Sequence, residues 1–293
     1  MVAFTAEAIA PLYPHLKKSH LTSIVTPQIQ HRIDLIKSWD IQPGEKILEL
    51  GCGQGDCTIA LAAAVGEEGH VTAVDPGSLD YGSPYTLGQA QAHLKASKLG
   101  SRITFVQADP VQYIRNVSGE FTTAVLAHCI WYFASPSVLS DILKALSTRV
   151  QRICIAEYNL TASDPRAIPH LLAALTQAAV EAHDPESTSN IRTLLSPDAI
   201  NAHAVGVGLT LEKEAVLTPN EGMLDGKWET LTVVEADYLE RIWAVVKDEK
   251  ERAVVSAMRD SVIGSLLVVQ GKGGQVKTMD VHTFVYTPAK SSE

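Results

Sequence analysis

The sequence predicts an α/β fold in which a mostly parallel β-sheet lies between two layers of helices. Three observations predict it: short apolar runs alternate with helical segments between residues 40 and 160, glycines follow the first run directly, and acids end the next two. Strands that alternate with helices form parallel sheets through right-handed crossovers. Because such sheets bind ligands at the carboxyl ends of their strands, we expect these glycines and acids to face a ligand.

The first strand and the turn after it are predicted around Lys46–Leu50. Gly51, Gly53 and Gly55 follow at once, and an apolar helical run covers Thr58–Val65. A strand, a glycine turn and a helix N-terminus bring backbone N–H groups close to a ligand. The same glycines also fit an ordinary strand-to-helix turn, so the turn alone does not predict a nucleotide site.

The second strand, His70–Asp75, ends in an acid about two dozen residues after the first glycine. That spacing is typical of the acid that hydrogen-bonds a ribose in nucleotide-binding folds. The third strand likewise ends in an acid, Asp109, and the fourth carries His128 near its end. Further strands are predicted over Ile103–Asp109, Phe121–Cys129 and Arg152–Tyr158.

The segments outside this core are mainly helical. We expect one domain over residues 1–293, with a helical lid over 1–39, a core over 40–160, and a helical insertion over 218–270 before the last strand. Within the later part, the pattern predicts a helix over 165–183, a helix that begins at Ser196-Pro197, a strand over 209–217, a polar loop over 218–228, helices over 235–269 and a strand over 279–286.

Composition excludes several classes of function. The formal net charge of −9 repels phosphate backbones, so nucleic acid is not expected as a partner. No uninterrupted apolar run reaches the roughly 18 to 20 residues of a membrane span, and the N-terminus lacks the pattern of a signal peptide. The four cysteines have no zinc-module spacing and suit a reducing compartment. We therefore expect a soluble, cytoplasmic protein without a metal; the oligomeric state is not predicted.

The motif Glu49-Leu-Gly-Cys-Gly-Gln-Gly55, followed by Asp75, Asp109 and Ala127-His128, resembles the class I S-adenosylmethionine-dependent methyltransferases. NAD-binding domains more often carry Gly-x-Gly-x-x-Gly, and here the third glycine comes one residue earlier. The resemblance implies a Rossmann-like three-layer sandwich with a seven-stranded sheet and a late antiparallel strand. It is strongest to small-molecule methyltransferases, with fungal secondary metabolism as the narrower expectation.

The resemblance also implies roles for single residues. S-adenosylmethionine (SAM), with S-adenosylhomocysteine as product, would be the cofactor. The methionine moiety would lie on the glycine turn, organised by Glu49, and Asp75 would accept both ribose hydroxyls. Asp109 would accept from the adenine amino group. The cofactor site implied in this way comprises Glu49, Gly51, Gly53, Gly55, Asp75, Pro76, Asp109, Pro110, Ala127 and His128.

One residue departs from the family pattern. The residue after the adenine-binding acid commonly donates its backbone N–H to adenine, but here it is Pro110, which has none. Either another group supplies that hydrogen bond or the adenine sits slightly differently.

His128 is the candidate general base, because it is expected beside the sulfonium and an imidazole suits proton transfer near neutral pH. An equal alternative is that His128 only packs against the cofactor or forms a hydrogen bond with it. His20 is a second, weaker catalytic candidate. The candidate substrate-binding residues are aromatic side chains that could instead be core residues: Tyr13, Trp131, Tyr132, Tyr158, Trp228 and Tyr238.

The favoured function is methyl transfer to a small organic molecule. One alternative is a SAM-binding protein of the same fold with a non-methylating or regulatory role. Another is a protein methyltransferase. The Asn/Asp-Pro-Pro-Tyr motif of amino-directed base methyltransferases is missing, since Ala127-His-Cys-Ile130 stands in its place.

Overall fold

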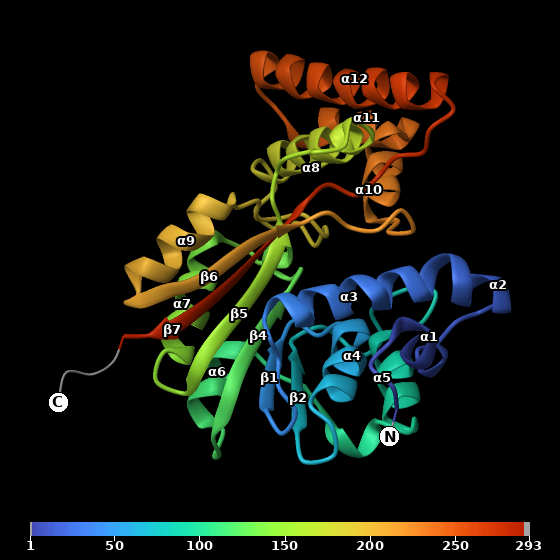
Figure 1. Ribbon diagram of the computed structural model, residues 1–293. Helices are drawn as coiled ribbons and strands as arrows, with labels where there is room; N and C mark the ends of the chain where they lie inside the picture. The colour runs from blue at the N-terminus through green and yellow to red at the C-terminus, as the bar shows by residue number, and fades with distance from the viewer. Residues whose placement is uncertain (1, 290–293) are drawn as a thin grey trace.

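The computed structural model describes residues 2–289 and contains a seven-stranded sheet with the strand order β3-β2-β1-β4-β5-β7-β6 (Figure 1). The five strands of the predicted core run parallel, and β7 is antiparallel to both β5 and β6. The mostly parallel sheet with a late antiparallel strand is therefore confirmed. The strands are β1 (Lys46–Leu50), β2 (His70–Asp75), β3 (Ile103–Gln107), β4 (Phe121–Ala127), β5 (Val150–Tyr158), β6 (Leu209–Leu217) and β7 (Val281–Pro288).

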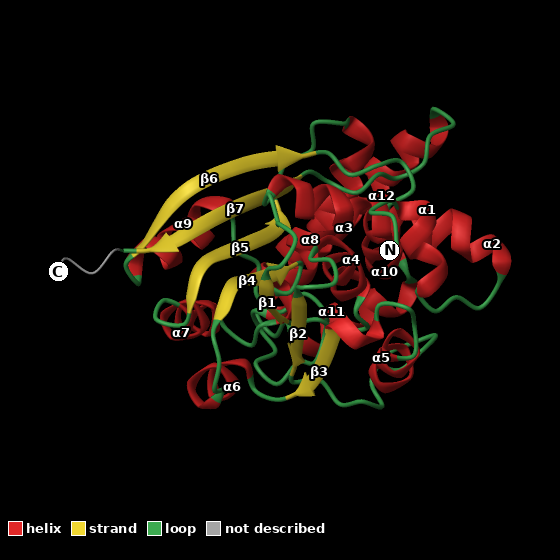
Figure 2. Ribbon diagram, turned by 60° about the horizontal axis from the view of Figure 1, so that its bottom comes forward, coloured by secondary structure: helices red, strands yellow, loops and turns green. Residues whose placement is uncertain are grey.

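Two layers of helices cover the sheet, and Figure 2 shows its twist from a second direction. Successive residues of a strand point to opposite faces, so Ile47 and Val125 enter one hydrophobic cluster while Leu48 and Leu126 enter the other. The first cluster packs under α1 (Ala6–Ile9), α3 (Thr26–Ser38) and α4 (Asp56–Ala64), with Leu94 of α5 (Leu87–Lys95). The second packs under α6 (Pro110–Asn116), α7 (Pro136–Leu146) and α9 (Pro197–Gly206).

Residues before β1 form a chain of short helices that ends in α3. α1 is followed by a 3₁₀ turn over Ala10–Leu12, by α2 (Lys18–His20) and by a π-helical turn over Leu21–Val25. One face of α3 carries the fully buried side chains Ile29, Ile33 and Ile36, which pack against residues of the sheet. The first half of α3 reaches the carboxyl edge of the sheet, where His31 contacts His128.

The remaining helices gather above the sheet in Figure 1 and form a cap. The cap helices are α8 (Ile168–Glu181), α10 (Asp225–Val234), α11 (Ala236–Val245) and α12 (Glu249–Gly271). They share a hydrophobic cluster of their own, in which Val233, Tyr238 and Val262 are buried. The cap is therefore held together by its own core and does not depend only on contacts with the sheet.

The prediction of a loop as far as Trp228 is wrong, because α10 already begins at Asp225. Close packing explains the difference. A side chain at Gly226 would lie 2.3 Å from the carbonyl oxygen of Lys277, so the start of the helix docks directly on a neighbouring backbone. Since Gly226 also donates its N–H to Thr278 Oγ1, tertiary contacts set the start of this helix.

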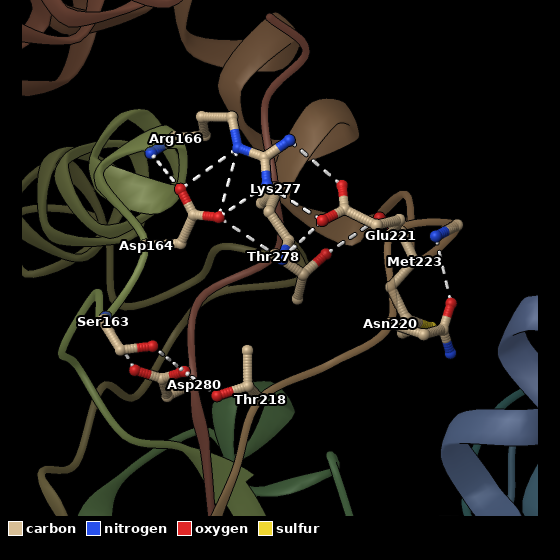
Figure 3. A network of polar contacts seen from close by, with 11 residues as sticks. Ser163, Asp164, Arg166, Thr218, Asn220, Glu221, Met223, Lys277, Thr278 and Asp280 are labelled. Carbon is tan, nitrogen blue, oxygen red and sulfur yellow. Dashed lines mark hydrogen bonds and ion pairs between the residues drawn. The ribbon is translucent and has the colours of Figure 1, made fainter.

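A polar network joins the chain segments that connect the cap to the sheet (Figure 3). Arg166 forms ion pairs with Asp164 at 2.7 Å and with Glu221 at 2.9 Å, and Lys277 lies 3.0 Å from Glu221. Below it, buried Asp280 accepts hydrogen bonds from Ser163 and Thr218. The network joins three connecting segments, residues 163–166, 218–221 and 277–280. Because exposed ion pairs contribute little stability, its main effect is to align these segments.

By length and composition alone, α12 could cross a membrane: its most apolar 18 residues have a mean hydropathy of 1.4, and 22% of them are buried. One such helix is weak evidence. Arg259, in the middle of α12, donates three hydrogen bonds to the carbonyl end of α10, from Nε to Val233 at 3.0 Å and from Nη2 to Val234 and Glu235 at 2.9 and 3.0 Å. These bonds tie α12 into the cap.

We predict that Arg259→Met lowers the free energy of unfolding by about 2 to 4 kcal/mol, because three carbonyls lose charged hydrogen bonds. Urea denaturation followed by circular dichroism measures the change. Lys250→Met, an exposed change on the same helix, is the matched control and should leave stability within about 0.5 kcal/mol. Equal stability of the two variants would contradict a structural role for Arg259.

Candidate functional site

A cavity of about 1070 Å³ opens at the carboxyl ends of β1, β2 and β4. This is where the strand order reverses, since β1 lies between β2 and β4 and their connections leave in opposite directions. Residues of the glycine turn, the β2 loop, the end of β4, the lid and α10 all line it. The structure thus brings the sequence motifs and the N-terminal helices to one cavity.

The glycine turn forms one wall of this cavity. Gly51 has φ +71°, and a Cβ there would lie 2.5 Å from Cys129 Cβ, so only glycine allows this approach of the β1 and β4 ends. Gly55 has φ +86° and directly precedes α4, where a Cβ would meet Leu94. Gly51 and Gly53 line the cavity, whereas Gly55 packs against the protein interior.

Two acids stand along the next wall. The carboxylate of Asp75 accepts hydrogen bonds from the backbone N–H groups of Gly53 and Gly77, both at 2.8 Å, which ties the first two turns together. Asp109 caps α6 by accepting from Gln112 N at 2.8 Å, and Pro110 occupies the first helical position. Proline is well suited there because that N–H would have no intrahelical partner. Asp75, Pro76, Asp109, Pro110, Ala127 and His128 all line the cavity.

Glu49 lies behind the glycine turn and is 2% exposed. Its carboxyl accepts a hydrogen bond from Thr58 Oγ1 in the first turns of α4, so it links β1 to the helix after the turn. Burial raises the pKa of Glu49 to about 8, against the opposing effect of the Thr58 hydrogen bond. It supports the cavity wall from behind.

The lid and the cap close the other side of the cavity. Tyr13 lines it and donates from its hydroxyl to Gln54 Oε1 at 3.2 Å, which connects the lid to the glycine turn. His20, Tyr132 and Trp228 also line it, the last from α10. Arg32 of α3 lines it too and is paired through Nε with Asp56 Oδ2 at 2.8 Å. Among the residues described, nothing hydrogen-bonds the buried Arg32 Nη1.

His128 follows β4 in a left-handed conformation, with φ +52°. Non-glycine residues adopt this region rarely and at a cost in energy, and such residues cluster at functional sites. Its Nε2 lies 2.9 Å from Nε2 of His31 in α3, and its Nδ1 lies 3.4 Å from Glu157 Oε1 at the end of β5. Burial, reinforced by the charge of Arg32, holds the pKa of His128 well below its usual range.

Three aromatic candidates do not line the cavity. Trp131 and Tyr158 lie behind His128, with the Tyr158 ring 4.5 Å from that of His128 and 4.7 Å from that of Trp131. The Tyr158 hydroxyl donates to Asp225 of α10, so this tyrosine links the sheet to the cap. Tyr238 packs in the hydrophobic core of the cap. Its ring is held by apolar neighbours in the cap, away from the residues that line the cavity.

Sequence reasoning missed Arg32, His31 and the part played by Glu157. His31 and Arg32 lie in α3, a helix of mixed polarity, and the one signal in the sequence is that these two polar residues stand next to the apolar residues of its buried face. Glu157 lies near the end of the predicted strand Arg152–Tyr158, and no motif in the sequence gives it a role. Within residues 2–289, no group of three or more His, Cys, Asp or Glu side chains is arranged so that it could hold a metal ion.

The raised pKa of Glu49 gives a pH-dependent prediction. A carboxyl whose pKa is about 8 when folded and 4.5 when unfolded contributes its full stability below pH 4.5 and loses it as pH rises to 8. Relative to Glu49→Gln, which cannot titrate, the wild type should lose about 1.4 kcal/mol of unfolding free energy per pH unit between pH 5 and 8. Urea melts of both proteins at pH 5, 6, 7 and 8 measure it. A constant difference would contradict the raised pKa.

Comparison with known proteins agrees with this geometry. A family model described as "Methyltransferase domain" matches residues 47–151. The chain is 28% identical to methyltransferase phomM of Diaporthe leptostromiformis, over 83% of this chain and 79% of that protein. It is 30% identical to a solved cyclopropane-fatty-acyl-phospholipid synthase-like protein from Lactobacillus casei, with a TM-score of 0.82 over 96% of this chain and 98% of the other.

A more distant likeness extends to the cyclopropane synthase MmaA2 of Mycobacterium tuberculosis, at 13% identity and a TM-score of 0.53, over 98% of this chain and 96% of that one; this likeness shows the shared fold alone. The matched residues run from β1 to the start of β5 and include the glycine turn, Asp75, Asp109 and His128, which line or support the cavity. The chain belongs to the class I S-adenosylmethionine-dependent methyltransferases and is an enzyme of that family, with S-adenosylmethionine as its cofactor.

Proposed function

We propose that the enzyme transfers the methyl group of SAM to a small organic molecule by in-line displacement. One observation carries the proposal: a single cavity runs from Asp75, past His128, to Tyr13 and Trp228 under the lid and the cap. A cofactor on the glycine turn and an acceptor under the lid could therefore meet beside His128. A volume of about 1070 Å³ is at the upper end of pockets for small ligands, which suits two of them.

We assign the cofactor to the half of the cavity formed by the strand ends. Asp75 would accept from the ribose hydroxyls, Asp109 from the adenine amino group, and backbone groups of Gly51 and Gly53 would face the methionine moiety. Arg32 would hold the methionine carboxylate, since it lies beside the first residue of α4 and has a buried N–H group that no described residue binds. A guanidinium is well suited to a carboxylate.

We assign the acceptor to the half formed by the lid, the segment after β4, and α10. Tyr13, His20, Tyr132, Phe133 and Trp228 line this part. Aromatic and aliphatic walls with a few polar groups favour a compact, largely apolar molecule. A large protein substrate is less well suited, because lid and cap residues would have to admit it.

The names of the relatives bear on the acceptor only in part. The Diaporthe protein is named a methyltransferase, which supports methyl transfer, and a role in secondary metabolism stays a prediction. The name of the Lactobacillus casei protein refers to fatty-acyl phospholipids, so an unsaturated acyl chain is a second acceptor class worth testing. The cytoplasmic location also stays a prediction.

The chemistry requires alignment more than covalent help from the protein. SAM supplies an activated methyl group, and the enzyme holds the acceptor atom in line with it, which can lower the barrier by several kcal/mol. If the acceptor is a hydroxyl or an amine, its proton must leave. We propose His128 as the group that receives this proton, because it lies on the cavity wall between the two halves.

The test is a transfer assay with tritiated-methyl SAM against panels of phenols, amines, thiols, unsaturated acyl lipids and peptides. We expect transfer to at least one class of small molecule and none to peptides. Gly51→Val is the negative control, because its side chain would clash with Cys129 and remove the cofactor site. Transfer to peptides alone would contradict the proposal and favour a protein methyltransferase.

The proposed role of Arg32 predicts a ligand-dependent effect. Arg32→Met should weaken S-adenosylhomocysteine by about 1.5 to 3 kcal/mol, the range for hydrogen bonds to charged groups. It should leave 5′-methylthioadenosine unaffected, because that ligand lacks the carboxylate. Isothermal titration calorimetry measures both, with Lys37→Met, an exposed change on the same helix, as control. An equal loss for both ligands would mean that Arg32 acts only on the structure.

A further inference from the structure

Three titratable side chains stand in a row beside the cavity, each from a different element. His31 comes from α3, His128 from the end of β4 and Glu157 from the end of β5. The two histidine Nε2 atoms are 2.9 Å apart, and His128 Nδ1 is 3.4 Å from Glu157 Oε1. His31 and Glu157 are each 1% exposed, so water does not compete freely for these contacts.

The orientation of Glu157 is fixed by the backbone. Its Oε2 accepts from Ile130 N at 3.1 Å and its Oε1 accepts from Tyr158 N at 3.0 Å. Two N–H donors favour the ionised carboxylate, whereas burial raises the pKa of Glu157 to about 7. The carboxylate therefore presents an acceptor oxygen to one side of the His128 ring. At 3.4 Å this contact is longer than a hydrogen bond, and no described residue hydrogen-bonds His128 Nδ1. The contact is electrostatic: an N–H on Nδ1 is attracted by the ionised carboxylate, whereas an unprotonated Nδ1 is repelled by it.

A proton on Nδ1 determines the rest of the row. A neutral imidazole then has its lone pair on Nε2, so the short contact to His31 requires that His31 Nε2 donate. In the opposite arrangement, with the proton of His128 on Nε2, an acceptor nitrogen would face the Glu157 carboxylate without a hydrogen. With Glu157 ionised, as it is above its pKa of about 7, the geometry therefore favours one tautomer for each of the two histidines.

We propose that Glu157 and His31 are positioning residues that hold His128 with its proton on Nδ1, so that Nε2 is the atom that takes a proton from the methyl acceptor. This inference rests on the proposed function. During transfer, the acceptor's O–H or N–H replaces the N–H of His31 at Nε2. The proton moves to Nε2, the freed electron pair forms the bond to the methyl carbon, and the electrons of the methyl–sulfur bond return to sulfur.

The surrounding charges suit this role. Facing His128 are His31 and Arg32 from α3, Asp56 from α4, Glu157 and Tyr158 from β5, His170 from α8, and, bonded to the Tyr158 hydroxyl, Asp225 from α10. Burial keeps His128 and His31 neutral near pH 7, as a proton acceptor and its donor partner require. The imidazolium formed by proton transfer would have the Glu157 carboxylate beside its Nδ1–H.

The backbone of His128 argues against a purely packing role. A left-handed φ of +52° costs energy in a residue with a Cβ, and many side chains could fill an apolar gap without it. This conformation turns the ring so that one nitrogen faces Glu157 and the other faces the lid. His170 offers a contrast in the same cluster, because its Nδ1 accepts from Met279 N at 3.0 Å and its tautomer is fixed independently.

The test reads the tautomers directly by two-bond ¹H–¹⁵N correlation spectra of protein labelled with ¹⁵N-histidine, without added ligand, at pH 8, above the raised pKa of Glu157. His31→Asn and His128→Asn assign the two rings. We expect His128 Nε2 at the downfield position of an unprotonated nitrogen and Nδ1 at the upfield position of a protonated one. His31 should show the opposite pattern, with its proton on Nε2.

Glu157→Gln supplies the second arm. Without the carboxylate, the His128 signals should move toward the Nε2-protonated pattern, while those of His170 stay in place as an internal control. Two results would overturn the proposal: a wild-type His128 with its proton on Nε2, or a His128 pattern unchanged by Glu157→Gln. If that variant does not fold, the wild-type spectrum decides alone. Failure here leaves the result of the methyl-transfer screen unaffected, so the two proposals are tested separately.

Discussion

The close approach of two strand ends is the constraint on which the site depends. Gly51 after β1 and Cys129 after β4 lie so near each other that a Cβ at position 51 would be 2.5 Å from Cys129 Cβ. This contact occurs where the strand order reverses, and it brings the glycine turn and His128 to the same cavity. Because both segments follow buried strands, the sheet itself fixes their spacing and little of it depends on flexible loops.

Lid, sheet and cap meet in one buried polar cluster beside that contact. α3 contributes His31 and Arg32, the sheet contributes His128 and Tyr158, and α10 contributes Asp225. Buried polar groups are costly unless they are paired, so such a cluster holds the three parts in one relative arrangement. Because the cluster is buried, electrostatic interactions within it are stronger than they would be in water.

The cap has a core of its own and connects to the sheet through segments that share the ion pairs around Arg166. Its helices α10 to α12 contribute nothing to the two hydrophobic clusters of the sheet, whereas α8 shares the first of them through Ala174. The proposed acceptor half of the cavity draws Trp228 from this cap, whereas the proposed cofactor half draws on strand ends. In this proposal, donor and acceptor specificity come from different parts of the chain.

The sequence alone determined the alternation of strands and helices, the glycine turn and the acids at strand ends, because these follow from local periodicity and spacing. It also singled out His128 and the family. Tertiary structure decided which residues meet: it placed His31 and Glu157 on either side of His128, brought Arg32 to the cavity, and kept Tyr238 in the cap. These residues are far apart in the chain, and contacts between distant segments leave no local pattern that a single sequence can reveal.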